Sequence, residues 1–191
     1  MQADMHKFIP LLALLSALAT NASAAPQTLV STDSHIGFTV KEMGVPVAGQ
    51  FKQFTATISL DPLKPEQASA EIRIDIGSLS TGTEEADAIA LSPDWLDKAH
   101  APVATFKSVA VRALGDGDYL ADGVLSIRNQ NRDLSVRFHR AAQSDGKTVI
   151  TGDFVIKRSQ FGIGGGLWNE EGVVAEEIPV NVRLTLAAPA Q

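Results

Sequence analysis

Apolar and polar residues alternate along most of the chain after Gln27. In residues 68–76 every second residue is aliphatic, and residues 178–186 repeat the pattern. Because side chains in a strand point alternately to its two faces, this period of two predicts β-strands with one apolar face. The same parity predicts further strands at 36–40, 54–60, 134–138 and 154–156.

Turn residues separate these segments. They lie at Asp61-Pro62, at Gly115-Asp116-Gly117, at Asn129-Gln130-Asn131 and at Ser144-Asp145-Gly146. Short turns between strands are typical of antiparallel pairing. We therefore expect an all-β fold of about eight antiparallel strands.

Residues 83–98 interrupt the alternation. Thr83 can cap a helix, and the acidic residues that follow it suit the positive end of the helix dipole. Pro93 must break the helix, so we predict a short helical insertion within 83–98.

Strands with one apolar face can bury it in a sandwich of two sheets or in a barrel that closes on itself. The periodicity is the same in both architectures and does not choose between them. A barrel of about eight strands is just wide enough to be filled by side chains or to hold one small ligand.

The N-terminal residues have the features of a cleavable export signal. Lys7 precedes a short apolar run at 8–19, and Ala22-Ser23-Ala24 provides the small residues of a cleavage site. We predict a signal peptide at 1–24, cleaved after Ala24, and a periplasmic single domain at 25–191. The absence of cysteine excludes a disulfide-stabilised scaffold.

The chain carries a formal net charge of −6. It has no basic run, so nucleic acid is not an expected partner.

Three stretches together resemble the YceI-like family of secreted bacterial domains. They are Ser34–Val40 followed by Gly49, Phe51 and Phe54; 95–106; and 161–168 followed by 173–178. The third stretch is closest to the branch found beside b-type membrane cytochromes. The resemblance implies a lipocalin-like closed barrel that binds a long isoprenoid or a similar amphiphile, and it does not imply catalysis.

Large residues on the apolar parity are the candidate lining of such a barrel. They are Phe38, Val40, Phe51, Phe54, Ile72, Ile74, Phe106, Phe138, Phe154 and Trp168. A hydrocarbon ligand needs a continuous apolar lumen rather than directed polar groups. The alternative is that the same residues fill a solid core.

A cation near the predicted barrel mouth is a further candidate. Lys157 or Arg158 follows a predicted strand and could neutralise a polar or phosphorylated lipid head. The glycine-rich run at 162–166 lacks the Lys-Ser/Thr and the helix of a phosphate-binding loop, and we interpret it as a strand distortion next to Trp168.

No metal or catalytic site is expected. His35, His100 and His139 lie in distant segments without the spacing of a zinc motif. The acids of 84–97 are explained by a solvated, capped helix, and no serine has a nucleophile motif.

These observations favour a periplasmic carrier of a long-chain isoprenoid, with a quinone as one candidate cargo, no required cofactor and no enzymatic activity. The alternatives are a lipid-modifying enzyme that uses the same cavity and a solid-core interaction domain. A b-type cytochrome is a candidate partner. A homodimer through short edge segments and an exposed Trp95 region is a further expectation.

Overall fold

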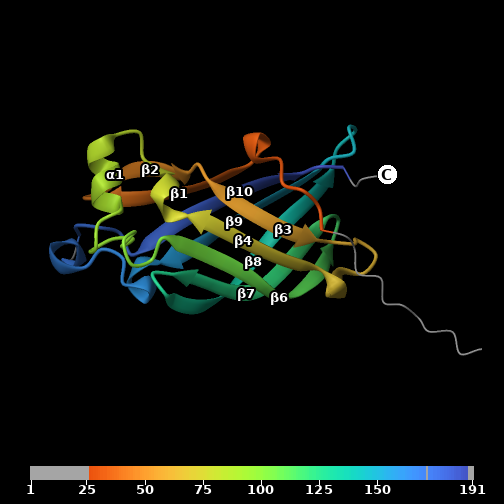
Figure 1. The fold of residues 1–191 in the computed structure, drawn as a ribbon. Coiled ribbons are helices and arrows are strands. Elements are labelled where there is room, and N and C mark those ends of the chain that lie inside the picture. Colours follow the sequence, from red (N-terminus) through yellow and green to blue (C-terminus); the bar gives the residue numbers. More distant parts are fainter. Residues whose placement is uncertain (1–25, 171, 189–191) are drawn as a thin grey trace, which may run out of the picture.

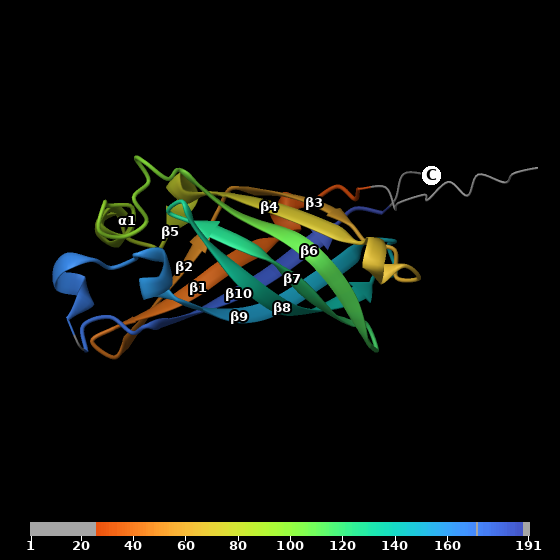
Figure 2. The ribbon, with the colours of Figure 1, turned by 90° about the horizontal axis from the view of Figure 1, so that it is seen from below.

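The computed structural model describes residues 26–170 and 172–188, so the predicted signal peptide lies outside the described residues. The fold of these described residues consists of a single strongly curled sheet of ten antiparallel strands and one α-helix (Figures 1 and 2). The elements are β1 (His35–Glu42), β2 (Val45–Phe51), β3 (Phe54–Ser59), β4 (Ser69–Asp75), β5 (Leu79–Ser80), α1 (Glu84–Ala90), β6 (Val103–Gly115), β7 (Asp118–Ile127), β8 (Gln130–Ala142), β9 (Thr148–Lys157) and β10 (Glu177–Leu186). None of the helices in these residues is long and apolar enough to span a bilayer.

The antiparallel all-β prediction is confirmed, but the expectation of about eight strands in a closed barrel is wrong. The strand order is β3-β4-β6-β7-β8-β9-β10-β1-β2-β5, and β3 and β5 are the two edges. Closure fails because β2 pairs with β1 while β3, which follows it after a bend, pairs with β4. The count differs mainly because β5 has only two residues and because Pro46 and Gly49 weaken the strand signal of β2.

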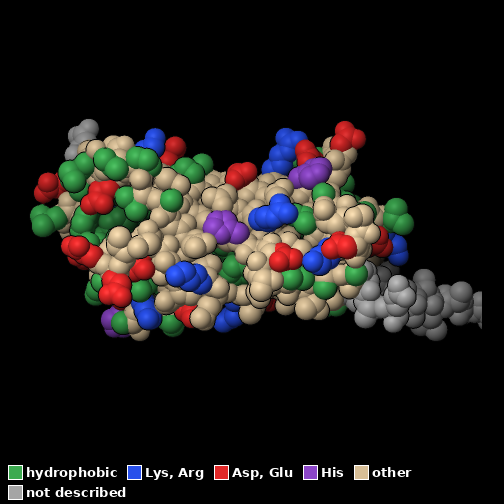
Figure 3. Space-filling view, turned by 90° about the horizontal axis from the view of Figure 1, so that it is seen from above, with side chains coloured by type: hydrophobic (Ala, Val, Ile, Leu, Met, Phe, Trp, Pro, Cys, Tyr) green, Lys and Arg blue, Asp and Glu red, His purple; other side chains and the backbone are tan. Residues whose placement is uncertain are grey.

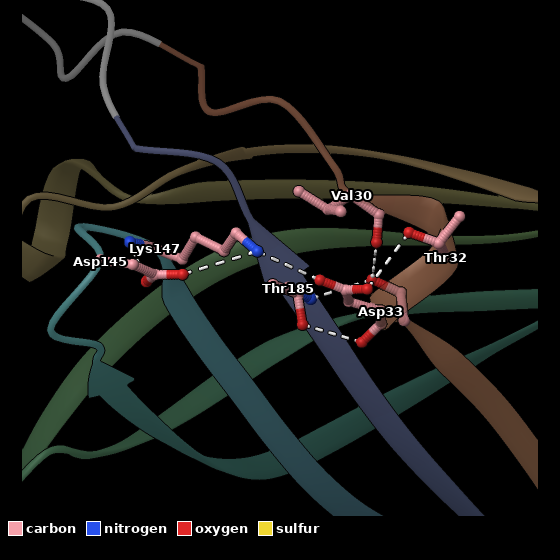
Figure 4. A network of polar contacts seen from close by, with 7 residues as sticks. Val30, Thr32, Asp33, Asp145, Lys147 and Thr185 are labelled. Carbon is pink, nitrogen blue, oxygen red and sulfur yellow. Dashed lines mark hydrogen bonds and ion pairs between the residues drawn. The ribbon is translucent and has the colours of Figure 1, made fainter.

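The N-terminal segment bridges the open seam at one end of the barrel, which we call the distal end. Gln27 forms an isolated bridge with Ile58 of β3, and Leu29 forms one with Leu186 of β10. Figure 4 shows the polar contacts that follow. The Thr185 hydroxyl donates to the Asp33 carbonyl at 2.8 Å, and the Lys147 ammonium lies 3.2 Å from the Asp33 carboxylate.

These contacts predict that acid loosens the distal end. The hydrogen bond from Lys147 holds the pKa of Asp33 below its ordinary value of 3.8. A carboxyl with a lowered pKa contributes stability above that ordinary value and loses it as the pH falls through the folded-state pKa. We expect the hydrogen-exchange protection of the Val30 amide, which donates to the Thr185 carbonyl, to fall below pH 3.8. Asp33→Asn should remove this pH dependence, and unchanged protection of Val30 in acid would contradict it.

The local structure of α1 follows the sequence. The Thr83 hydroxyl accepts from the Ala86 amide at 3.4 Å and caps the helix, which ends at Ala90 before the break that Pro93 imposes. The predicted helical insertion is therefore confirmed. In the β7–β8 turn, Arg128 and Asn129 have φ angles of 50° and 58°, as a type I′ hairpin turn requires.

The glycine-rich run departs from its predicted structure. Residues 162–166 lie in the loop between β9 and β10, not within a strand. Gly162, Gly164 and Gly166 have φ angles of 66°, 74° and 59°. Repeated left-handed residues turn the chain too sharply for a strand, so the predicted strand distortion is wrong.

Candidate functional site

An apolar cavity lies inside the curled sheet. Along β8 the inward-facing Leu134, Val136 and Phe138 are only half-buried, and exposed residues alternate with them. Inward side chains of a filled core would be almost fully buried, so their remaining accessible surface faces internal space. The cavity has a volume of about 260 Å³, near the lower end of ligand-sized pockets.

The structure brings most of the predicted ligand residues together around this cavity. Nine of them line it: Phe38, Val40, Phe51, Ile72, Ile74, Phe106, Phe138, Phe154 and Trp168. Phe54 does not line it and packs against a buried cluster at the distal end. Ligand contact by these residues stays a prediction, but the structure does place all nine around the same cavity.

A buried cluster lies at each end of the cavity. At the distal end, Leu184 and Leu186 are fully buried beside Ile58. The opposite end carries α1 (Figure 2), and we call it the α1 end. In the buried cluster there, Trp95, which follows α1 in the chain, and Trp168 form an edge-to-face pair with ring centroids 5.4 Å apart. Trp95 is only 8% exposed, so the predicted exposed surface at Trp95 for a homodimer is wrong. The indole fills the cavity wall instead.

Helix α1 covers the cavity with few large side chains. Ala86, Ile89 and Ala90 line the cavity, and no residue of α1 is fully buried. The Asp87 carboxylate accepts from the Thr81 amide at 2.6 Å and from the Thr81 hydroxyl at 2.7 Å. These two hydrogen bonds hold the pKa of Asp87 below its ordinary value, and the bond from the Thr81 hydroxyl has the larger effect. The sequence gives little signal for this tether, because a helical acid without a nearby cation has the pattern of ordinary surface charge.

Arg158 does not lie at an open mouth. Its side chain is buried, and it is not part of the cavity lining. One terminal nitrogen donates to the carbonyls of Ile163 and Gly164, each at 3.0 Å, and the other to those of Trp168 and Val174, each at 3.3 Å. The predicted contact of Arg158 with a lipid head is therefore not supported, because its donors already hold the β9–β10 loop.

Gly49 leaves the space that the Phe38 ring occupies in the cavity wall. The two residues are cross-strand partners, and a Cβ on residue 49 would lie 2.3 Å from the Phe38 ring. The Phe38 ring also packs on Phe51, with centroids 5.5 Å apart.

We expect Gly49→Ala to push the Phe38 ring into the cavity and to weaken binding of an apolar fluorophore several-fold. Fluorescence titration measures this affinity, and Gln50→Ala, at the exposed neighbouring position, is the control. Equal affinity in both variants would show that Phe38 does not define the wall.

Ionisable groups are scarce in the cavity. Glu42 is the one ionisable side chain among the described residues that line it. The histidine contacts lie on the surface: His100 is 2.9 Å from Asp97, and His139 is 2.8 Å from Asp118. Within residues 26–170 and 172–188, no group of three or more potential ligands could hold a metal ion.

Comparison with known proteins identifies the family. The model of the YceI-like domain matches residues 27–186, which is nearly all of the described chain. The chain belongs to the YceI-like family. A UPF0312 protein of Shewanella baltica is 28% identical over 165 residues, covering 78% of this chain and 86% of the relative. A UPF0312 protein of Pseudomonas aeruginosa is 28% identical over 169 residues, covering 83% and 88%.

Two solved structures share the architecture. BcnA of Burkholderia cenocepacia superposes with a TM-score of 0.80 at 31% identity, covering 83% of this chain and 99% of BcnA. A domain of Saccharophagus degradans, described as polyisoprenoid-binding, superposes with a TM-score of 0.67 at 18% identity, covering 88% and 100%. At that identity the second likeness establishes the fold alone.

Proposed function

We propose that this protein binds a long-chain isoprenoid or a similar amphiphile in its barrel and carries it through the periplasm. The observation that carries the proposal is the hollow apolar interior, whose inward side chains keep accessible surface. Each methylene that leaves water for such a lining contributes about 0.8 kcal/mol without needing a directed partner. A flexible hydrocarbon chain is therefore the ligand class that this lining suits best.

The family supports the same ligand class. The related domain of Saccharophagus degradans is described as polyisoprenoid-binding, and this chain has the same fold. We extend the proposal to export by the predicted signal peptide, to an isoprenoid quinone as one cargo, and to a b-type cytochrome as the recipient. A homodimer, if formed, uses strand edges rather than Trp95, which is buried.

Enzymatic use of the cavity is the weaker alternative. Acid-base chemistry on a bound lipid needs titratable groups that converge on it. Among the described lining residues, only Glu42 can ionise. A binding role makes fewer demands on the residues present.

Native mass spectrometry of the mature protein, purified without detergent, tests the proposal. We expect a stoichiometric adduct that organic extraction identifies as an isoprenoid. Exchange of added polyprenols but never of quinones would remove the quinone from the proposal. A ligand-free mass together with failure to take up any added isoprenoid would overturn the carrier function and favour an interaction domain.

A further inference from the structure

Glu42 ends an otherwise apolar row on β1. Ile36, Phe38, Val40 and Glu42 occupy alternate positions of the strand, and all four line the cavity. Glu42 is half-buried and forms an isolated backbone bridge with Val174 in the β9–β10 loop. The row therefore runs along the lumen and finishes with a carboxylate at the α1 end.

The Glu42 carboxylate has no protein partner in the described part of the chain. It takes part in none of the side-chain hydrogen bonds or ion pairs there. The buried cation of the neighbouring loop, Arg158, directs its terminal nitrogens to four backbone carbonyls. Glu42 is thus an uncompensated acceptor at the edge of an apolar cavity.

We propose that Glu42 receives the polar head of the bound amphiphile and selects a head that donates hydrogen bonds. This inference rests on the proposed lipid-binding function. An ionised carboxylate only accepts hydrogen bonds, so a hydroxyl or an ammonium head satisfies it. A phosphorylated head brings a second negative charge next to it, and repulsion between like charges strengthens at a partly desolvated site.

The hydrophobic surface near Glu42 fits a port at the same end. Met43 and Val45, beside Glu42 in the β1–β2 hairpin, are 74% and 63% exposed, and Leu167 of the β9–β10 loop is 80% exposed. Figure 3 shows hydrophobic side chains gathered at this end of the molecule with acidic side chains among them. The hydrocarbon tail of an amphiphile entering here would pass on into the apolar lumen, and its polar head would stay at the α1 end beside the Glu42 carboxylate.

A set of ligands with one chain and different heads tests this selectivity. We would titrate the mature protein with geranylgeraniol, geranylgeranylamine, geranylgeranyl phosphate and the matching hydrocarbon, each in competition with a neutral apolar fluorophore. In the unmodified protein the phosphate should bind at least about tenfold more weakly than the alcohol. Glu42→Gln should reduce that difference, and Glu42→Lys should make the phosphate the tightest ligand.

Glu170→Lys is the matched control, because it makes the same charge change at an exposed loop position outside the cavity lining. Glu170→Lys should leave the order of the four affinities unchanged. The hydrocarbon has no polar head, so its affinity should be the same in every variant. The inference is overturned, and the carrier function retained, if all heads bind equally or if Glu42→Lys does not alter the order. If no ligand binds to any variant, both the carrier function and this inference fail.

Discussion

Arg158→Met is expected to destabilise the protein by about 3–5 kcal/mol, because it leaves four carbonyls of the β9–β10 loop without their donor. The methionine side chain fills similar space but donates no hydrogen bond. Urea denaturation followed by tryptophan fluorescence measures the loss. Because Trp168 belongs to both the loop and the cavity wall, affinity for an apolar ligand should fall as well.

Two further variants at this position separate charge from geometry. Arg158→Lys keeps the positive charge but lacks the planar fork that reaches several acceptors, so we expect it to restore only part of the stability. Lys157→Met, at the exposed neighbouring position, should change the free energy of unfolding by no more than about 0.5 kcal/mol. Unchanged stability of Arg158→Met with a selective loss of phosphorylated-lipid binding would instead restore the headgroup role.

The sequence contained a signal for the actual position of Arg158. Phe154, Ile156 and Arg158 share one parity, and Phe154 and Ile156 line the cavity. Parity alone directs Arg158 inward, whereas its charge led to the prediction that it meets a lipid head at the barrel mouth. What the sequence could not provide is the set of acceptors, because they come from a loop with several left-handed glycines whose path is not set by periodicity.

The strands with strong alternation of apolar and polar residues could be predicted from the sequence. The order in which they pair, and the open seam that results, could not. The predicted strand at 68–76 contains β4 (Ser69–Asp75), and the one at 178–186 lies within β10 (Glu177–Leu186), since each has a clear apolar face. The seam between β2 and β3 depends on one bend at which the chain changes partners. Hydrophobic parity continues through such a bend, so it does not report which neighbour each half of the chain pairs with.

The same limit applies to the interior of the barrel. An inward-facing phenylalanine has the same sequence pattern whether it fills a core or lines a cavity. The difference lies in how the summed side-chain volume compares with the space that ten curled strands enclose. The prediction of a hollow interior came from the family resemblance and not from the alternation of residues. In the structure, the hollow interior is visible as the incomplete burial of inward-facing residues such as Val136 and Phe138.

Val136→Trp is expected to abolish ligand binding while leaving the protein as stable as before. Val136 is a half-buried inward residue of β8 that lines the cavity, so an indole there can occupy free space and displace the ligand. Overpacking a filled interior typically costs about 1–3 kcal/mol, whereas filling an existing cavity adds apolar contacts. The control is Val155→Trp, at an outward position of β9 that is 51% exposed, which should bind ligand normally.

Stability and affinity must both be measured for Val136→Trp, because together they distinguish a hollow interior from a filled one. Urea denaturation reports whether the interior accepts the added volume, and titration with an apolar fluorophore reports whether the cavity remains. Retained stability with lost binding is the result that a hollow carrier requires. A loss of about 1–3 kcal/mol would indicate a filled interior. Retained stability with unchanged affinity would place the ligand outside the barrel, because the same 260 Å³ cannot hold both an indole and an isoprenoid chain.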